Sequence, residues 1–191
     1  MARQIGLLGG SFNPAHQGHL HVASTALKRL QLSEIWFTIA QGNPLKSEHG
    51  AYEERCASVG HLIDGYARFK LCEVEAEQNL TYTIDTVSTL RHLYRQDRFV
   101  WIMGSDNLET FHRWRAWEQI ACGIPIAIVS RPGRRPGRSV FERTFSKYKL
   151  PEAKARLLPA LQAPAWVYLK APFHPHSSTA IRNKKSGHTV K

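Results

Sequence analysis

Two histidines three residues apart, His16 and His19, stand where an apolar segment gives way to a helical pattern. The run from Ile5 to Leu8 predicts a short buried strand, and apolar residues recur at helical spacing from Leu20 onward. The first turn of a helix has unpaired backbone N–H groups and the positive end of the helix dipole, so it attracts anions. Imidazoles on that turn would add hydrogen-bond donors. The pattern therefore indicates phosphate chemistry.

A glycine-rich turn joins this strand to this helix. Gly9 and Gly10 permit a tight turn and would let a phosphate or a ribose lie against the backbone, and Asn13-Pro14 is a second turn signal. The segment is neither a P-loop nor a dinucleotide-binding G-x-G-x-x-G motif, because both patterns are incomplete. An ordinary turn with solvent-facing histidines explains any one of these residues. The full combination favours an anion site.

The composition is that of one domain with a buried core. The chain has 191 residues, of which 42% are hydrophobic. It has no apolar run near the ~18 residues of a membrane span, and its first residues lack a secretion-signal pattern, so we expect no membrane partner. Three scattered cysteines lack metal-ligand spacing, and we expect reduced core thiols in the cytoplasm. They are Cys56, Cys72 and Cys122.

The net charge of +11 suits either nucleic acid or a polyanionic small substrate. Four arginines lie between Arg131 and Arg138, and the segment after Arg182 adds three lysines. Neither stretch has the interleaved aromatic residues on which single-stranded bases stack. This argues against nucleic acid as a partner, for which the 131–138 loop is the only support.

Strand and helix patterns alternate along the chain, which predicts a doubly wound, Rossmann-like parallel α/β sheet with helices on both faces. We expect five to six strands in a single domain over 1–183, followed by a basic, disordered tail over 184–191. The expected strands are 5–8, 34–40, 67–74, 99–103, 124–129 and 165–169. The clearest helical patterns start near Gly18, Tyr52 and Thr83, where Thr83 would be the N-cap. Residues 139–162 are expected to hold only short helices.

Ligands of such sheets bind at the carboxyl ends of the strands, near the point where the strand order reverses. Several stretches whose residues could bind or react with a ligand follow expected strands and should meet at that edge. They are 9–19, 43–47, 104–107, 130–132 and 177–182.

A second anion site is indicated near the end of the chain. Ser177, Ser178 and Thr179 would stand at a helix start, with Arg182 within one turn. The alternative is an ordinary hydroxyl cap with a surface arginine.

Two further residues have both a functional and an ordinary interpretation. Asp106 follows a buried strand and could accept hydrogen bonds from ribose hydroxyls, or could cap the next helix. Lys46 lies in the second loop and could neutralise phosphate charge, or could be a solvated surface lysine.

The segment from Gly9 to His19 resembles the G-G-[ST]-F-[DN]-P-x-H-x-G-H signature of the HxGH nucleotidyltransferases, which transfer adenylyl or cytidylyl groups. The segment from Ser177 to Arg182 resembles the S-[ST]-T-x-[IL]-R signature of the same superfamily, which contacts the β- and γ-phosphates of ATP. Three further segments resemble bacterial nicotinate mononucleotide adenylyltransferases. They are 81–87, 101–114 and 130–133, so that the resemblance spans about 5–182.

The resemblance implies transfer of the adenylyl group of ATP, carried with Mg²⁺, to nicotinate mononucleotide, giving deamido-NAD and pyrophosphate. It implies no metal site of the protein's own. The implied catalytic residues are His16, His19 and Arg182. The implied ATP-binding residues are Gly9, Gly10, Ser11, Phe12, His16, Gly18, His19, Gly104, Asp106, Ser177, Ser178, Thr179 and Arg182. The implied residues for the mononucleotide are Asn13, Lys46, Tyr82, Thr83, Trp114 and Arg131.

In that family backbone amides at Tyr82 and Thr83 would hold the nicotinate carboxylate, and an aromatic ring at Trp114 would stack on the pyridine. The alternative for Trp114 is a core tryptophan. A sister transferase acting on nicotinamide mononucleotide or phosphopantetheine is the nearest rival, and a basic nucleic-acid-binding module without catalysis is a remote one. The sequence leaves the oligomeric state open.

Overall fold

The computed structural model describes residues 2–41, 50–131, 137 and 139–171. Several predicted site residues and the predicted tail lie outside these ranges. They are Lys46, Ser177, Ser178, Thr179, Arg182 and residues 184–191.

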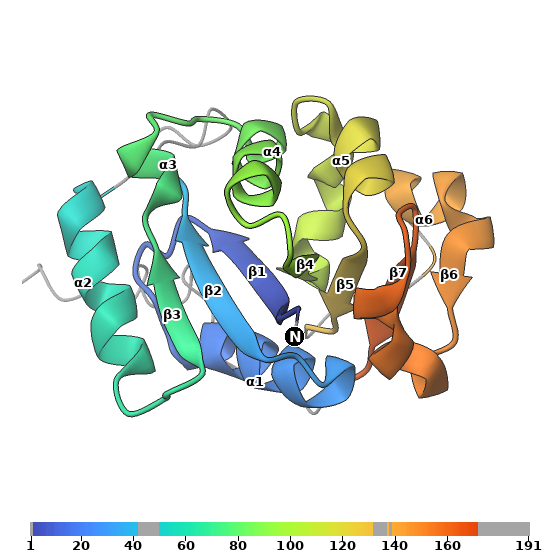
Figure 1. Cartoon of the computed structure of the whole chain (residues 1–191), viewed down its shortest axis with the longest axis horizontal. Coiled ribbons are helices and arrows are strands. Elements are labelled where there is room, and N and C mark those ends of the chain that lie inside the picture. The colour runs from blue at the N-terminus through green and yellow to red at the C-terminus, as the bar shows by residue number, and fades with distance from the viewer. Residues whose placement is uncertain (1, 42–49, 132–136, 138, 172–191) are drawn as a thin grey trace, which may run out of the picture.

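One parallel sheet of seven strands organises the chain, in the order β3-β2-β1-β4-β5-β7-β6 (Figure 1). The strands are β1 (Gln4–Gly10), β2 (Glu34–Ile39), β3 (Phe69–Cys72), β4 (Arg98–Gly104), β5 (Ile126–Val129), β6 (Lys149–Leu150) and β7 (Trp166–Leu169). All six strand pairs run parallel. The prediction of five to six strands was wrong by the edge strand β6, whose two residues are too few to give an alternating pattern.

Helices occupy the connections between the strands. The α-helices are α1 (Gln17–Leu30), α2 (Tyr52–Ile63), α3 (Val74–Glu77), α4 (Thr83–Leu93), α5 (Trp117–Gly123) and α6 (Val140–Thr144). The 3₁₀ segments are η1 (Ser105–Glu109), η2 (Phe111–Arg113), η3 (Ser146–Tyr148) and η4 (Glu152–Ala160). In Figure 1, α4 and α5 lie above the strands and α1 lies below them.

A separate hydrophobic core covers each face of the sheet, because successive residues of a strand point to opposite faces. Leu8 of β1 packs in the core formed with α1, α2 and η4, whereas its neighbour Leu7 packs in the core formed with α3, α4, α5 and α6. Central strands buried on both faces explain the continuous apolar runs in the sequence.

The strand order reverses between β1 and β4, which are neighbours in the sheet. The helix that follows β1 packs on one face of the sheet, and the helices that follow β4 pack on the other. The turn that follows Gly10 and the segment that follows Gly104 therefore leave the sheet side by side. This is the position at which doubly wound sheets bind their ligands.

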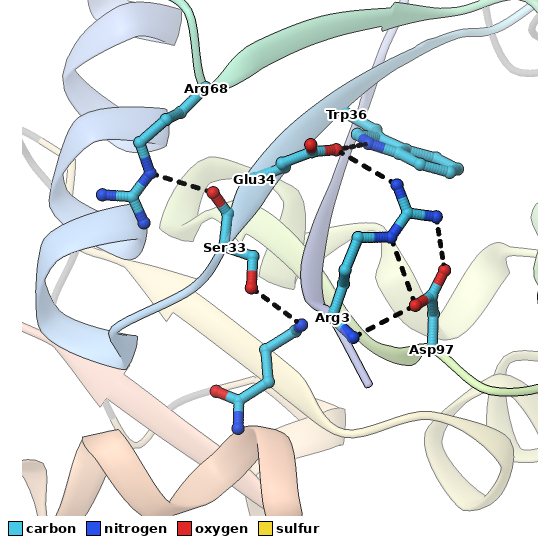
Figure 2. A network of polar contacts seen from close by, with 7 residues as sticks. Arg3, Ser33, Glu34, Trp36, Arg68 and Asp97 are labelled. Carbon is cyan, nitrogen blue, oxygen red and sulfur yellow. Dashed lines mark hydrogen bonds and ion pairs between the residues drawn. The ribbon is translucent and has the colours of Figure 1, made fainter. Parts of the chain in front are cut away.

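At the opposite, amino edge, a polar network holds the starts of three strands together (Figure 2). Arg3 donates to Asp97 through its backbone N–H at 3.1 Å and through Nη2 at 2.6 Å, and these bonds hold the pKa of the Asp97 carboxyl below its usual range. Arg3 also lies 3.8 Å from Glu34, which accepts the indole N–H of Trp36 at 2.8 Å. The network fixes the register of β1 against β2 and β4 from the edge away from the site.

Candidate active site

The turn after β1 ends in a reciprocal histidine cap on α1. His16 is the N-cap, and its Nδ1 accepts the backbone N–H of Gly18 at 3.0 Å. The backbone N–H of His16 in turn donates to Nδ1 of His19 at 3.2 Å. Because Nδ1 is an acceptor in both rings, each neutral imidazole carries its proton on Nε2. The local structure thus fixes the tautomer and makes Nε2 the donor of both rings.

The two rings differ in exposure, although their centroids are only 3.9 Å apart. His16 is 5% exposed, whereas His19 is half-buried. His16 therefore has a structural role as a cap in addition to any chemical role. His19 is the imidazole of the pair that can more easily reach a ligand.

The glycines and Phe12 of this turn have packing roles that the sequence did not indicate. A Cβ on Gly9 would lie 2.3 Å from the Trp101 indole, and one on Gly10 would lie 3.2 Å from the Phe12 ring. Phe12 itself is 1% exposed, adopts φ 45°, and packs against Phe37 and His19. Its side chain belongs to the core, so only its backbone could serve the ATP role that we expected of it.

The other predicted site residues of this turn are buried or half-buried, and contacts with α2 hold the turn in place. Ser11 and Asn13 are half-buried, and Gly18 is buried in the first turn of α1. A Cβ on Gly50, just before α2, would lie 3.2 Å from the side-chain oxygen of Asn13. Ser58 of α2 accepts the backbone N–H of Ala15 at 3.1 Å, which holds the turn against that helix.

Asp106 and Arg131, predicted for two different substrates, form an ion pair at the ends of β4 and β5. Asp106 Oδ1 lies 3.4 Å from Arg131 Nε. The N-cap of η1 is Gly104, without a side-chain cap bond, so Asp106 does not cap that segment. A Cβ on Gly104 would lie 2.3 Å from Asp106 and 2.8 Å from Arg131, so glycine leaves room for the pair. Ser105 Oγ accepts the Arg131 backbone N–H at 2.8 Å and orients the loop.

A third group of predicted residues surrounds the start of α4. Tyr82, with extended backbone, is the N-cap of α4, and the prediction of Thr83 at that position was wrong by one residue. The Arg115 guanidinium carbon lies 4.5 Å from the Tyr82 ring centroid, which brings the segment after η2 against the start of α4. Trp114, next in the chain to Arg115, is half-buried and makes T-shaped ring contacts with Trp101 and Phe111. Part of Trp114 is therefore core and part is accessible.

Sequence reasoning missed two buried charged residues beside the turn. Arg55 of α2 is 3% exposed and Glu75 of α3 is 4% exposed. Arg55 could have been noticed, because it lies three residues after Tyr52 and four before Val59, on the inward face of an amphipathic helix. Glu75 lies in a polar stretch without a clear helical or strand pattern, and it gave no comparable signal.

A cavity of about 730 Å³ lies at the amino edge of the sheet, beside Arg91, Arg98 and Pro159, and contains none of the predicted site residues. Since parallel sheets bind ligands at the carboxyl edge, we assign the site there and not to this cavity. Within the described ranges, no helix is long and apolar enough to cross a membrane. The same ranges contain no cluster of three or more His, Cys, Asp or Glu residues suited to a metal ion.

Residues 7–184 match the cytidylyltransferase-like family model. A protein of Ruegeria sp. named "Probable nicotinate-nucleotide adenylyltransferase" is 40% identical over 182 residues, covering 94% of this chain and 96% of the relative. A protein of Bradyrhizobium sp. with the same name is 45% identical over 184 residues, covering 94% and 95%.

Among solved structures, the Plasmodium falciparum nicotinic acid mononucleotide adenylyltransferase complexed with NaAD superposes with a TM-score of 0.75. It is 20% identical in sequence, and the match covers 95% of this chain and 83% of that one, so it supports the fold. The family model and the two relatives show that the chain belongs to the nicotinate-nucleotide adenylyltransferase family of cytidylyltransferase-like proteins.

Proposed function

We propose that this protein transfers the adenylyl group of ATP to nicotinate mononucleotide, giving deamido-NAD and pyrophosphate in NAD biosynthesis. The observation that carries the proposal is the reciprocal cap of His16 and His19, which fixes two Nε2 donors at the start of α1 and at the switch point of the sheet. The named relatives support the choice of substrates.

No side chain acts as a nucleophile in the proposed reaction. An oxygen of the mononucleotide 5′-phosphate attacks the α-phosphorus of ATP, and the bond from that phosphorus to the bridging oxygen of the β-phosphate breaks. Pyrophosphate leaves with the electron pair. Catalysis then consists of positioning and charge stabilisation. His16 and His19 donate from Nε2 to the phosphate oxygens on which negative charge grows.

ATP enters as its Mg²⁺ complex, with the metal held by the phosphates. On this proposal Ser177, Ser178, Thr179 and Arg182 bind the outer phosphates. Asp106 accepts hydrogen bonds from the adenosine ribose, and its contact with Arg131 orients the carboxylate. On this proposal Arg131, which contacts Asp106, binds the phosphate of the mononucleotide, and Lys46 is a second candidate for that role.

The acceptor subsite is formed by the start of α4 and by Trp114. Free N–H groups in the first turn of α4, after Tyr82, suit a carboxylate better than a neutral amide. The accessible part of the Trp114 indole offers a face for the flat, electron-poor pyridine ring. The ring contact suits either pyridine nucleotide, and the N–H groups favour nicotinate mononucleotide over nicotinamide mononucleotide.

Pyrophosphate release tests the proposal directly. The protein is incubated with MgATP and, separately, with nicotinate mononucleotide, nicotinamide mononucleotide or phosphopantetheine. We expect the highest kcat/KM with nicotinate mononucleotide. Faster release with either other acceptor assigns the protein to a sister activity, and the absence of release with all three refutes adenylyl transfer.

We also propose a cytoplasmic location, on the chemistry of the cysteines. All three are free thiols, and burial raises the pKa of Cys72 to about 11. Such thiols persist in a reducing compartment. A fluorescently tagged full-length chain found outside the cytoplasm would contradict this.

A further inference from the structure

Arg55 is a buried cation that, within the described part of the chain, hydrogen-bonds to four backbone carbonyls. Nη1 donates to the Ser11 carbonyl at 3.0 Å and to the Ala40 carbonyl at 2.7 Å, Nη2 donates to the Gln41 carbonyl at 3.2 Å, and Nε donates to the Gly50 carbonyl at 3.1 Å. These carbonyls come from the turn after β1, the end of β2 and the start of α2. One guanidinium therefore joins three separate segments at the carboxyl edge of the sheet.

Burying a guanidinium carries a large desolvation cost, which four carbonyl hydrogen bonds only offset. An apolar side chain on this inward face of α2 would avoid that cost. The arrangement is therefore better explained by the geometry it fixes than by stability. Because the C=O and N–H of a trans peptide point in opposite directions, a fixed Ser11 carbonyl also fixes the direction of the Phe12 N–H in the phosphate-binding turn.

Glu75 continues this network to the acceptor side. Its Oε2 accepts the backbone N–H of Gln41 at 3.3 Å, and its Oε1 accepts the Thr86 hydroxyl at 2.8 Å. Gln41 is thus held by Arg55 through its carbonyl and by Glu75 through its N–H. The Thr86 hydroxyl also lies 3.3 Å from the carbonyl of Tyr82, the N-cap of α4.

We propose that Arg55 and Glu75 are positioning residues of the transferase, which hold the ATP-binding turn and the acceptor-binding start of α4 in register through the backbone of Gln41. The chain of contacts runs from Ser11 through Arg55, Gln41 and Glu75 to Thr86. This inference rests on the function proposed above, because it needs both substrates to bind at the two ends of that chain.

Thr86→Val tests the acceptor end of the network. Valine has the shape of threonine without the hydroxyl, so it breaks the contact with Glu75 and leaves the Arg55 contacts in place. We expect the KM for nicotinate mononucleotide to rise about tenfold, the scale of one lost hydrogen bond to a charged group, with the KM for ATP within about twofold of wild type. Thr86→Ser retains the hydroxyl and should restore the wild-type KM.

Arg55→Lys tests the other end. Lysine keeps the charge, but its three donors on one nitrogen cannot replace the planar fork that reaches four carbonyls. We expect kcat/KM for ATP to fall by about two orders of magnitude, the scale of a misplaced reacting group. The matched control is Arg68→Lys, since Arg68 likewise donates to the carbonyls of Ser33 and Leu32, but at the amino edge (Figure 2).

Pyrophosphate release over a grid of both substrate concentrations gives each KM and kcat, and circular dichroism verifies folding. Folded Thr86→Val and Arg55→Lys proteins with wild-type kinetics overturn the positioning role while the proposed function stands. A Thr86→Val protein in which both KM values rise equally also overturns it, because that pattern signals general loosening. An inactive wild-type chain overturns the function, and this inference with it. If Arg55→Lys does not fold, Thr86→Val and Thr86→Ser still decide.

Discussion

Replacing Gly9 by alanine tests whether a glycine is needed at this position because the Trp101 indole packs against its Cα. The new Cβ would lie 2.3 and 2.4 Å from two ring carbons of Trp101, whereas such carbon atoms normally approach only to about 3.5 Å. The ring must therefore move by about 1 Å. It has no room to do so, because Trp101 is 1% exposed in a packed core.

Overpacking of this kind costs about 1–3 kcal/mol, and we expect the upper half of that range because a rigid indole must move. Removing a glycine from a strand returns about 0.5 kcal/mol. The net expectation for Gly9→Ala is a loss of about 2 kcal/mol, which is about a 30-fold rise in the unfolding equilibrium constant. Since Trp101 meets Trp114 edge to face at 6.3 Å, the KM for nicotinate mononucleotide should rise as well.

Urea denaturation followed by tryptophan fluorescence measures the stability change. The matched control is Gly60→Ala, because a Cβ on Gly60 meets nothing within 4 Å. Gly60 lies inside α2, where the same substitution should stabilise by about 1 kcal/mol. The two variants therefore carry the same chemical change, but the expected changes in the free energy of unfolding have opposite signs. A Gly9→Ala midpoint equal to or above that of wild type would refute the reasoning.

Three further predictions follow from contacts described above. His19→Asn keeps an acceptor at the Nδ1 position for the helix cap but loses the Nε2 donor, so kcat should fall about 10²-fold or more at unchanged stability. His19→Gln retains a donor near Nε2 and should lose less activity. A His19→Asn protein with the kcat of wild type would show that His19 takes no part in the chemistry. Gly104→Ala should push the Asp106 and Arg131 side chains apart and so raise the KM for ATP. The free energy of unfolding should stay within about 0.5 kcal/mol of wild type, because the ends of these flexible side chains can move. An unchanged KM for ATP would contradict the assignment of Asp106 to the ribose. Asp97→Asn should cost about 1 kcal/mol at pH 7, a value limited by solvent screening of its half-exposed arginine partner. The pKa of Asp97 is lower in the folded than in the unfolded protein, so this stabilisation is complete above the unfolded pKa of ~3.9 and is lost as the pH falls through the folded pKa. The urea midpoints of Asp97→Asn and wild type should therefore converge at low pH. A difference between the midpoints that stays constant with pH would show that the charge of Asp97 does not contribute to stability.

The sequence predicted the elements whose patterns are long and local. The apolar run of β1, the glycine turn and the helical period of α1 sufficed to place His16 and His19 at a helix start at the sheet's switch point. The two residues of β6 could not be predicted, since a pattern of period two needs more residues than that.

Contacts made across the fold were harder to predict than the elements. Asp106 and Arg131 follow different strands, and their pairing depends on β4 and β5 being neighbours in the sheet. Phe12 was expected among the ATP contacts because it lies within the motif, but its positive φ turns the ring into the core against Phe37. Arg55 shows a different limit, since its charge gave no reason to expect a buried side chain with a role at the site.

The placement of the three thiols has a practical consequence. Cys56 and Cys72 are buried, and burial raises the pKa of both, whereas Cys122 is exposed and lines the cavity at the amino edge. A maleimide at neutral pH should therefore react once per molecule, because it needs an accessible thiolate. A dye or a biotin attached there would leave the substrate-binding edge facing the solution, so the unmodified sequence is suited to oriented immobilisation and single-molecule work.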